Sequence, residues 1–435
     1  MINSTSKNLL SFIKNSPSCF HSIASIKKIL NREGFKQLTE NEVYNIELNG
    51  KYYITRNDSS IIAFKVGEEL DSYSFNMVAS HSDAPTFKIK PSCDLFSSDY
   101  HKLNVEAYGG MLCSTWFDRP LSIAGRVIVR HENKIITKLV NFDKNIVSLP
   151  SIPIHFNREA NSGFAYNLAV DMYPTISNDK MSFKEILANE INENVDDIIN
   201  YDLYLYNRQE GYFWGYNDEF MSSSKLDDLQ CAYTTLMGFI KSSNIHNVSV
   251  YCCFDNEEVG SSTRQGANST FLYDTLLRVS LSLNKSTQEH YKALAKSFMV
   301  SADNAHAVHP NHPELTDQLN TVFMNKGIVI KFNASQSYTS DSLSSSIFTT
   351  ICKNADVPSQ FFTNKSNIRG GSTLGNISAS HVSVMSVDIG LAQLAMHSCV
   401  ESSGTVDNEY MVKAIKEYYD SYLTIDENNN YIINK

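Results

Sequence analysis

Ionisable side chains follow several apolar segments of this 435-residue chain. His81 and Asp83 follow one such segment. The neighbouring carboxylates Glu257 and Glu258 follow a second, and Asp303 follows a third. A buried apolar strand rarely ends in acidic residues without a partner for them, because a buried charge must be paired. The pattern therefore favours a site in which imidazole and carboxylate groups act together.

Two further candidates are Asp227, which opens an apolar helical stretch, and His397. Each has an ordinary explanation when taken alone: Asp227 would compensate a helix dipole, and His397 would be a satisfied core histidine on a helix. The joint set changes this interpretation. Two histidines, three carboxylates and a spare glutamate are what a pair of divalent metals with mixed nitrogen and oxygen ligands requires. The set comprises His81, Asp227, Glu257, Glu258, Asp303 and His397.

The spacing of these residues suggests separate roles. Asp83 lies two residues after His81, where it is able to accept a hydrogen bond from the imidazole and fix the tautomer that binds a metal. Glu257 and Glu258 are adjacent at a strand end, so their side chains point in different directions. One of them can bind a metal while the other moves protons. Without the other motifs, a surface histidine and a solvated glutamate pair would be the simpler readings.

Strands and helices must bring these side chains to one place. Apolar runs typical of strands occupy residues 73–79, 248–254, 298–302 and 384–387, the last leading to Asp388. Helical patterns follow Pro17 as far as Gly34 and occupy residues 227–240 and 270–283. This alternation predicts an α/β fold whose sheet is covered on both faces. In such sheets ligands bind beyond the carboxyl ends of the strands, where the candidate residues fall.

Residues 92–221 have a different pattern. A strand-like alternation at 121–129, a turn at 131–133 and a second strand-like run at 135–140 predict a hairpin. Ser182 and Glu185 have the spacing of a capping box at the start of a helix. We therefore expect a discontinuous catalytic domain of residues 1–91 and 222–435, interrupted by a β-rich domain of residues 92–221.

Composition limits the class of partner. The chain has 37 Lys+Arg against 47 Asp+Glu, a net charge of −10, which argues against a nucleic-acid or anionic-membrane surface. The eight cysteines form no Cys-x-x-Cys pair and are typical of reduced thiols in a cytoplasmic protein. No run of 18 apolar residues and no signal-peptide core is present in the sequence. We expect a cytoplasmic protein with small or peptide partners.

Six motifs in order resemble those of the aspartyl aminopeptidase family of dinuclear zinc metallopeptidases. They are SHSD at 80–83, FDRPL at 117–121, KLDD at 225–228, DNEEVG at 255–260, SADNAHAVHPN at 301–311 and QLAMHS at 393–398. The resemblance implies a mixed sheet sandwiched by helices, with an inserted β-rich domain that forms dimers. It implies a zinc aminopeptidase that acts on short peptides.

The resemblance also assigns roles by motif. It implies that His81 and Asp303 hold one zinc ion, and that Glu258 and His397 hold the other. Asp227 would bridge the two, with a cis peptide bond between Asp227 and Asp228. Glu257 would be the general base. The expected cofactor is two Zn²⁺ per chain, with Mn²⁺ or Co²⁺ as substitutes.

Substrate recognition and assembly follow from weaker parts of the resemblance. Lys331 and Tyr338 resemble the segment that lines the specificity pocket, where a lysine pairs with an acidic first side chain. His155 resembles a histidine of the inserted domain that reaches a neighbouring subunit's active site in a dodecamer built from dimers. We expect acidic N-terminal residues to be slightly favoured, with large apolar residues such as leucine as the other outcome.

Two other classes of protein are compatible with a metal cluster. A water between two metals attacks phosphorus or acyl carbon alike, so a phosphoesterase or a deacylase is the nearest rival. A phosphatase would want arginine or lysine around the transferred group, and the sequence offers only Lys331. A metal-stabilised scaffold would leave Glu257 without a task and would favour closed tetrahedral sites.

Overall fold

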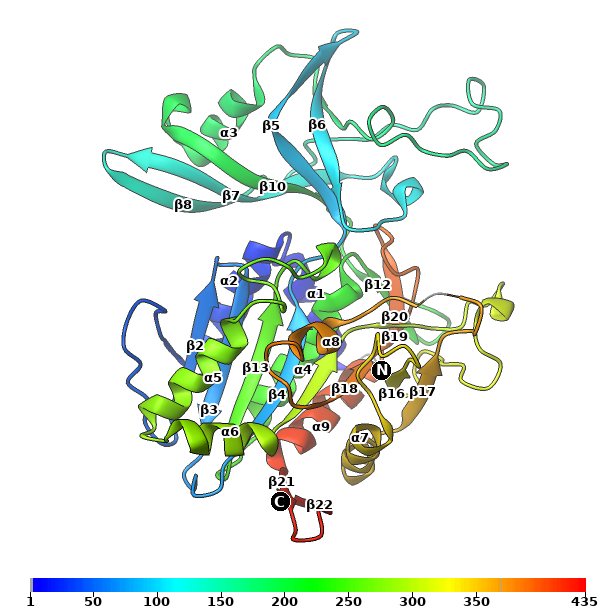
Figure 1. Cartoon of the computed structure of the whole chain (residues 1–435). Coiled ribbons are helices and arrows are strands. Elements are labelled where there is room, and N and C mark those ends of the chain that lie inside the picture. Colours follow the sequence, from blue (N-terminus) through cyan, green and yellow to red (C-terminus); the bar gives the residue numbers. More distant parts are fainter. Residues whose placement is uncertain (1–2, 369) are drawn as a thin grey trace.

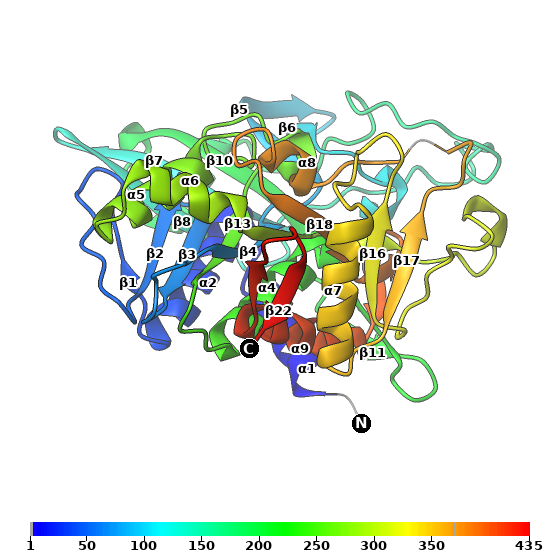
Figure 2. The ribbon, with the colours of Figure 1, turned by 60° about the horizontal axis from the view of Figure 1, so that its bottom comes forward.

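A computed structural model describes residues 3–368 and 370–435. The chain forms two parts, a large body built on one sheet and a smaller β-rich part above it (Figure 1). The large body has helices on both faces of its sheet (Figure 2). The predicted α/β fold, with a mixed sheet sandwiched by helices and a β-rich insertion, is confirmed.

The largest sheet has nine strands within the described residues. Strands β13, β4, β14 and β18 run parallel and lie side by side at its centre. On either side of this group, β3 pairs antiparallel with β13, and β16 pairs antiparallel with β18. The strands, in spatial order, are β1 (Lys36–Gln37), β2 (Lys51–Arg56), β3 (Ser60–Val66), β13 (Val248–Phe254), β4 (Phe75–His81), β14 (Phe298–Ala302), β18 (Met385–Gly390), β16 (Ile328–Phe332) and β17 (Ser359–Thr363).

Both faces of this sheet are apolar, as continuous apolar runs require. In β13, Val250 and Cys252 pack on one face, and Tyr251 and Cys253 pack on the other. One face is covered by α1 (Ser4–Lys14), α2 (Cys19–Arg32), α4 (Leu226–Lys241), α7 (Ser342–Asn354) and α9 (Asp407–Asp420). The other is covered by α5 (Phe271–Ser282), α6 (Thr287–Ala295) and α8 (Leu374–Ser378). The predicted helix after Pro17 is α2, and Gly34 follows it with a φ of +82°.

A second sheet forms the upper part of the molecule in Figure 1 and has its own apolar core. Its strands, in spatial order, are β8 (Lys134–Asn141), β7 (Leu121–His131), β10 (Ile198–Asn207), β5 (Thr86–Ser97), β6 (Tyr100–Tyr108) and β9 (Thr175–Ser177). The predicted hairpin is β7 and β8, and the predicted capping box of Ser182 and Glu185 begins α3 (Phe183–Ile191). This sheet spans residues 86–207, while the domain division at 92 and 221 stays a prediction.

A third sheet has five strands within the described residues. Its strands, in spatial order, are β11 (Tyr212–Trp214), β12 (Phe220–Ser223), β20 (Glu401–Gly404), β19 (Ala392–Leu394) and β15 (Ala305–His306). The remaining elements are β21 (Tyr422–Ile425), β22 (Tyr431–Asn434), and the short 3₁₀ turns η1 (Cys113–Trp116), η2 (Val195–Asp197), η3 (Glu257–Val259) and η4 (Pro313–Leu315). Among the described residues, no helix is long and apolar enough to span a membrane.

The hydroxyl of Tyr418 on α9 joins two central strands. It accepts a hydrogen bond from the Met77 backbone N (2.9 Å) and donates to the Phe298 carbonyl (2.7 Å), and all three residues are buried. Tyr418→Phe should lower the free energy of unfolding by about 1–3 kcal/mol, because it removes the hydrogen bonds that the hydroxyl makes to two buried backbone groups. Urea unfolding measures this change. Tyr212→Phe, at a side chain 43% exposed, is the control, and equal midpoints for the two variants would contradict the prediction.

Candidate metal centre

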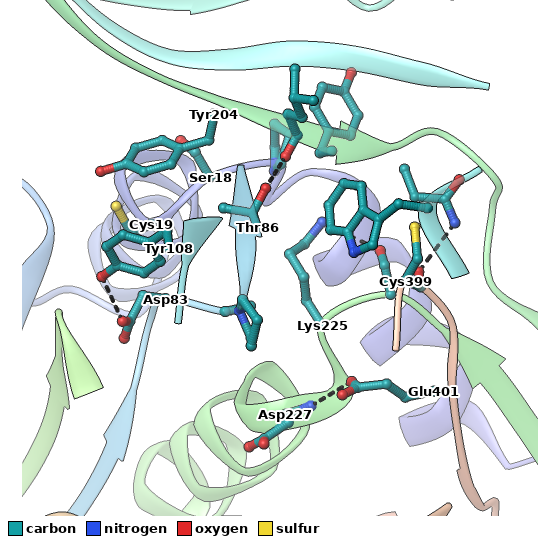
Figure 3. Close-up of a pocket in the computed structure, with 18 of the residues that line it drawn as sticks. Ser18, Cys19, Asp83, Thr86, Tyr108, Tyr204, Lys225, Asp227, Cys399 and Glu401 are labelled. Atoms are coloured by element: carbon teal, nitrogen blue, oxygen red, sulfur yellow. Dashed lines mark hydrogen bonds between the residues drawn. The ribbon is translucent and has the colours of Figure 1, made fainter. Parts of the chain in front are cut away.

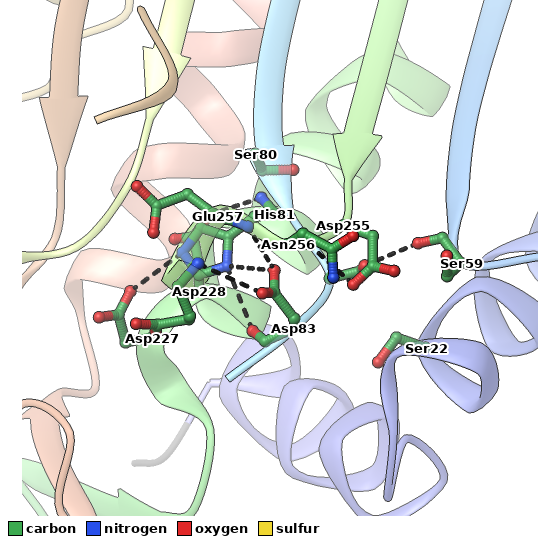
Figure 4. Close-up of polar contacts among 12 residues, drawn as sticks. Ser22, Ser59, Ser80, His81, Asp83, Asp227, Asp228, Asp255, Asn256 and Glu257 are labelled. Carbon is green, nitrogen blue, oxygen red and sulfur yellow. Dashed lines mark hydrogen bonds and ion pairs between the residues drawn. The ribbon is translucent and has the colours of Figure 1, made fainter. Parts of the chain in front are cut away.

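His81 is the last residue of β4, and its imidazole lies between two aspartates (Figure 4). The Nε2 atom is 3.5 Å from Asp227 Oδ1. The Nδ1 atom lies 3.2 Å from the backbone carbonyl of Asp83 and 3.4 Å from its Oδ1. Acceptors therefore face both ring nitrogens of His81, with Asp83 on the Nδ1 side and Asp227 on the Nε2 side. The contact of Asp83 with the Nδ1 side of the ring agrees with the spacing of the two residues.

Asp227 stands at the start of α4, where the backbone departs from helical angles and the Asp227–Asp228 peptide is cis. The predicted cis bond is therefore present. Asp227 Oδ2 lies 3.4 Å from His397 Nε2, while Oδ1 faces His81. Burial acts to raise the pKa of Asp227, but His397 and His81 lower it below its usual range. The two oxygens of one carboxylate thus face two different histidines.

Several groups of ionisable side chains lie within ligand distance of one another among the described residues, and two of these groups share Asp227. One contains His81, Asp227, Asp228 and Asp303, and the other contains Asp227, Glu258 and His397. Within each group, one ligand atom from every residue lies within 4.8 Å of the others. Glu258 Oε2 is 3.4 Å from His397 Nε2. The parallel strands β4, β13 and β14 deliver His81, the Glu257–Glu258 pair and Asp303 to one edge of the sheet, as their sequence positions predict.

His397 reaches this group from a turn that follows β19, with a φ of +64°, and not from a helix. Glu401, at the start of β20 and 1% exposed, holds the turn. Its carboxylate accepts hydrogen bonds from the backbone N of His397 (2.7 Å) and of Asp227 (3.0 Å). Burial and the nearby Asp227 raise the pKa of Glu401 to about 8. Glu401 was not predicted as a site residue, because a single glutamate at the start of a short strand has no sequence pattern that marks a functional role.

Asp83 anchors the turn that carries the two adjacent glutamates. Its Oδ1 accepts from the backbone N of Glu257 (3.2 Å), and its Oδ2 accepts from the backbone N of Glu258 (3.3 Å). The hydroxyl of Tyr108 donates to the same Oδ2 at 2.7 Å. Asp228 has a comparable role, because its Oδ2 accepts from the backbone N of His81 at 3.1 Å. Neither Tyr108 nor Asp228 was assigned a role from the sequence.

The electrostatics of the cluster fit a divalent cation. Among the described residues, the buried atoms Asp227 Oδ1, Asp228 Oδ1 and Glu258 Oε1 have no hydrogen-bond partner. Burial raises the pKa of Glu258 above its usual value and that of Glu257 to about 8. Carboxylate groups brought together in a buried site disfavour one another's charged forms, and a bound cation offsets this effect. Imidazole nitrogen and carboxylate oxygen are donors that zinc accepts, so the residues present fit zinc.

Lys331, predicted to line the substrate pocket, lies in β16 and is 2% exposed. Its Nζ donates to the carbonyl of Asn304 (2.7 Å) and lies 3.8 Å from Asp303 Oδ2. The ring of Tyr338, the second predicted pocket residue, has its centroid 5.4 Å from this ammonium group. Burial acts to lower the pKa of Lys331, but Asp303 and Tyr338 hold it above its usual value. The structure therefore brings Lys331 and Tyr338 together, directly beside a proposed metal ligand.

His155 is exposed and lies in the segment between β8 and β9, outside both groups of the cluster. Its neighbours in this segment include Ile154 (43% exposed) and Phe156 (86% exposed). Of the sequence-predicted site residues, the structure therefore gathers nine around one centre and leaves His155 apart from it. The nine are His81, Asp83, Asp227, Glu257, Glu258, Asp303, Lys331, Tyr338 and His397.

Comparisons with known proteins agree with this geometry. A family model described as aminopeptidase I zinc metalloprotease (M18) matches residues 12–419. A "Probable M18 family aminopeptidase 2" of Clostridium novyi is 48% identical over 421 residues, covering 94% of this chain and 97% of the relative. A relative of the same description from Pseudomonas fluorescens (strain SBW25) is 38% identical, covering 96% of this chain and 98% of the relative.

Solved structures share the fold over nearly the whole chain. A chain of a structure described as the cryo-EM structure of the Ape4 and Nbr1 complex matches with a TM-score of 0.92 at 34% identity, covering 96% of this chain and 85% of that chain. A structure described as the S. cerevisiae mApe1 dodecamer matches with a TM-score of 0.83 at 24% identity, covering 96% of both chains. The second likeness is one of fold.

Glu401→Gln should weaken metal binding although Glu401 is not a proposed ligand. The amide replaces one acceptor oxygen, so the backbone N of Asp227 or of His397 loses its partner and the two side chains move apart. Loss of such an outer support typically costs about 10- to 100-fold in metal affinity. Competition for zinc with a chromophoric chelator measures it. Glu409→Gln, on α9, serves as the matched control, and equal zinc affinities in the two variants would show that Glu401 does not hold the site.

Proposed function

The chain belongs to the M18 family of zinc aminopeptidases, and from this premise we propose that it removes N-terminal residues from short peptides with two zinc ions per chain. The metalloaminopeptidase activity follows from the family. The observation that carries the two-metal proposal is the position of Asp227, whose two carboxylate oxygens face the histidines of two ligand groups. A single carboxylate in that position is able to bridge two ions.

The proposed ligands divide by group. His81 and Asp303 would hold one ion, Glu258 and His397 would hold the other, and Asp227 would be shared by both. Asp83 orients His81 through the Nδ1 side of the ring, which leaves Nε2 for the metal. Zinc is the proposed metal, and Mn²⁺ or Co²⁺ are proposed substitutes because they accept the same donors.

Glu257 is the proposed general base. Zinc bound in such a site lowers the pKa of water toward about 7 and polarises the scissile carbonyl. The Glu257 carboxylate takes a proton from the attacking water and returns it to the nitrogen of the leaving amine. It is suited to this because the main-chain N of Glu257 is tied to Asp83, while its side chain lies near His81 and Glu258.

For specificity, we propose that an acidic N-terminal side chain is preferred. Lys331 supports this, because its ammonium group is buried beside Asp303 and Tyr338 and would pair with a carboxylate in a site with little water. A second candidate is a large apolar residue. The contact that favours it is the hydrogen bond from Lys331 Nζ to the Asn304 carbonyl, which together with Asp303 already engages the ammonium group.

We further propose that the chain assembles into a dodecamer built from dimers, and that His155 reaches the active site of a neighbouring subunit. The segment between β8 and β9 that contains His155 also exposes several large apolar side chains, which supports an interface there, since exposed apolar surface marks interaction sites. They are Ile152, Ile154, Phe156, Leu168 and Val170. A dodecamer is described for a relative of the same fold. The eight cysteines are free thiols, which supports a reducing compartment such as the cytoplasm.

Glu257→Gln should lose several orders of magnitude in kcat while retaining two zinc ions per chain, because it removes the base and leaves the ligands in place. His81→Ala and His397→Ala should instead lose metal, since each removes a nitrogen ligand. Metal analysis of the purified variants, together with rates on amino-acid arylamides with and without chelator, measures both effects. One ion per active wild-type chain would contradict the two-metal proposal. Zinc loss from Glu257→Gln equal to that of the histidine variants would reverse the assigned roles.

Lys331→Met should reduce the ratio of catalytic efficiencies on Asp and Leu arylamides, because it removes the cation that would pair with an acidic side chain. Each factor of ten in that ratio corresponds to about 1.4 kcal/mol. The ratio is the useful quantity, since any general damage to Asp303 would lower both rates together. A wild type that prefers Leu, with a ratio unchanged in Lys331→Met, would show that the second candidate is correct.

His155→Ala and Glu257→Gln should complement each other when the two chains are co-expressed. If His155 acts in a neighbouring subunit, a mixed assembly contains sites with an intact Glu257 from one chain and an intact His155 from the other. Activity of the co-expressed pair should therefore exceed that of either variant alone. Light scattering on the same samples gives the assembly state. An active monomer, or a co-expressed pair no more active than His155→Ala, would contradict the contribution of His155 in trans.

A further inference from the structure

Residues 108–115 cross from the second sheet to the metal centre. The segment begins at Tyr108, the last residue of β6, and runs into the turn η1. Figure 3 shows the Tyr108 side chain above Asp83, with a hydrogen bond between them, in a pocket that also contains Asp227 and Glu401. The segment therefore links the second sheet to residues of the metal centre.

The hydroxyl of Tyr108 supports the His81 half of the centre. It donates to Asp83 Oδ2 at 2.7 Å and accepts from Asn256 Nδ2 at 2.8 Å. Asp83 in turn contacts the ring of His81 and accepts hydrogen bonds from the backbone N of Glu257 and of Glu258. Without the hydroxyl, Asp83 Oδ2 would keep only the longer hydrogen bond from the backbone N of Glu258 (3.3 Å), so the carboxylate would be held less firmly. One hydroxyl thus bears on a proposed ligand and on the proposed base.

The rest of the segment supports the other half. Gly109 has a φ of +76°, and a Cβ placed there would lie 3.1 Å from the Cβ of Glu258. The backbone N of Leu112 donates to the carbonyl of His397 at 3.0 Å. The hydroxyl of Thr115 accepts from the backbone N of Cys399 at 2.9 Å. The segment therefore lies against Glu258 and His397, the two proposed ligands of the second group other than Asp227.

We propose that residues 108–115 are a positioning segment for the metal centre, and that Tyr108 is its principal positioning residue. The proposal rests on the proposed function, because it takes the cluster to be a zinc site. It gives the second sheet a task within its own subunit, in addition to any part in assembly. Tyr108 is not among the proposed ligands, and it acts on the site through its hydrogen bond to Asp83.

The test compares Tyr108→Phe with Tyr204→Phe in the full-length chain. Tyr204 comes from β10, and its ring packs edge-on against that of Tyr108 with centroids 5.5 Å apart, so the control removes a neighbouring hydroxyl from the same aromatic pair. Tyr108→Phe should release zinc to a chelator about tenfold faster than wild type and lower kcat with KM unchanged. Tyr204→Phe should match wild type in both measurements. Thermal unfolding of the metal-free proteins reports any general loss of stability.

A second pair of variants tests the contact with Glu258. Gly109→Ala and Gly34→Ala introduce a Cβ at similar backbone angles, φ of +76° and +82°, but the added Cβ at Gly34 meets no atom within 4 Å. The two therefore share the backbone penalty and differ in the contact. Gly109→Ala should weaken the zinc affinity by about tenfold relative to Gly34→Ala.

The outcomes separate the inference from the proposed function. A wild-type chain that binds no zinc and hydrolyses no arylamide would overturn the proposed function itself. If wild type binds two zinc ions and Tyr108→Phe releases them at the same rate as Tyr204→Phe, the function stands and the positioning role of Tyr108 is wrong. Equal zinc affinities for Gly109→Ala and Gly34→Ala would likewise remove the contact with Glu258 from the proposal.

Discussion

The constraint on which the rest of the structure depends is the burial of several carboxylates within a few ångströms of each other. Asp227, Glu258 and Asp303 are proposed ligands, and Glu257 lies beside them. Such a group is unfavourable in an apolar interior unless a cation and fixed dipoles compensate it. Parallel strands meet this constraint well, because their carboxyl ends lie at one edge of the sheet, between a dry core and the loops that close the site.

The way in which these residues are held follows a single pattern. Five backbone N–H groups of ligand or base residues donate to three carboxylates that are not proposed ligands. They are the N–H groups of His81 to Asp228, of Glu257 and Glu258 to Asp83, and of Asp227 and His397 to Glu401. These bonds fix the main chain behind each side chain, and the outer carboxylates add negative charge around the place of the cation. Removing an outer acid would therefore disturb both geometry and electrostatics.

The sequence predicted the inner part of this arrangement but only Asp83 of its outer part, for a physical reason. Apolar runs mark β4, β13 and β14, and His81, Glu257 and Asp303 lie within three residues of the ends of these runs, so the joint set was visible in the sequence. Glu401 and Tyr108 act through backbone pairing and long-range contact, which leave no local pattern. For Lys331, the strand was predictable, but the direction of its ammonium group depends on Asp303 and Asn304 from another strand end. His155 remains a prediction, since a single subunit does not test a contact between subunits.

The place of the insertion in the chain explains how it reaches the site. The second sheet leaves the large body at Thr86, five residues after His81, and ends at Asn207, before the turn that carries Asp227. The hydrogen bond from Thr86 Oγ1 to the carbonyl of Leu205 joins the two ends to each other. The hydrogen bond from Asn207 Nδ2 to the carbonyl of Cys399 ties them to the turn that carries His397. An insertion at the carboxyl edge of a sheet leaves strand pairing undisturbed while its first and last residues remain next to the reacting groups. Assembly through this part of the chain would therefore bear on the same edge that holds the metals, and the two properties would be coupled through packed, hydrogen-bonded contacts of the kind that Tyr108 makes.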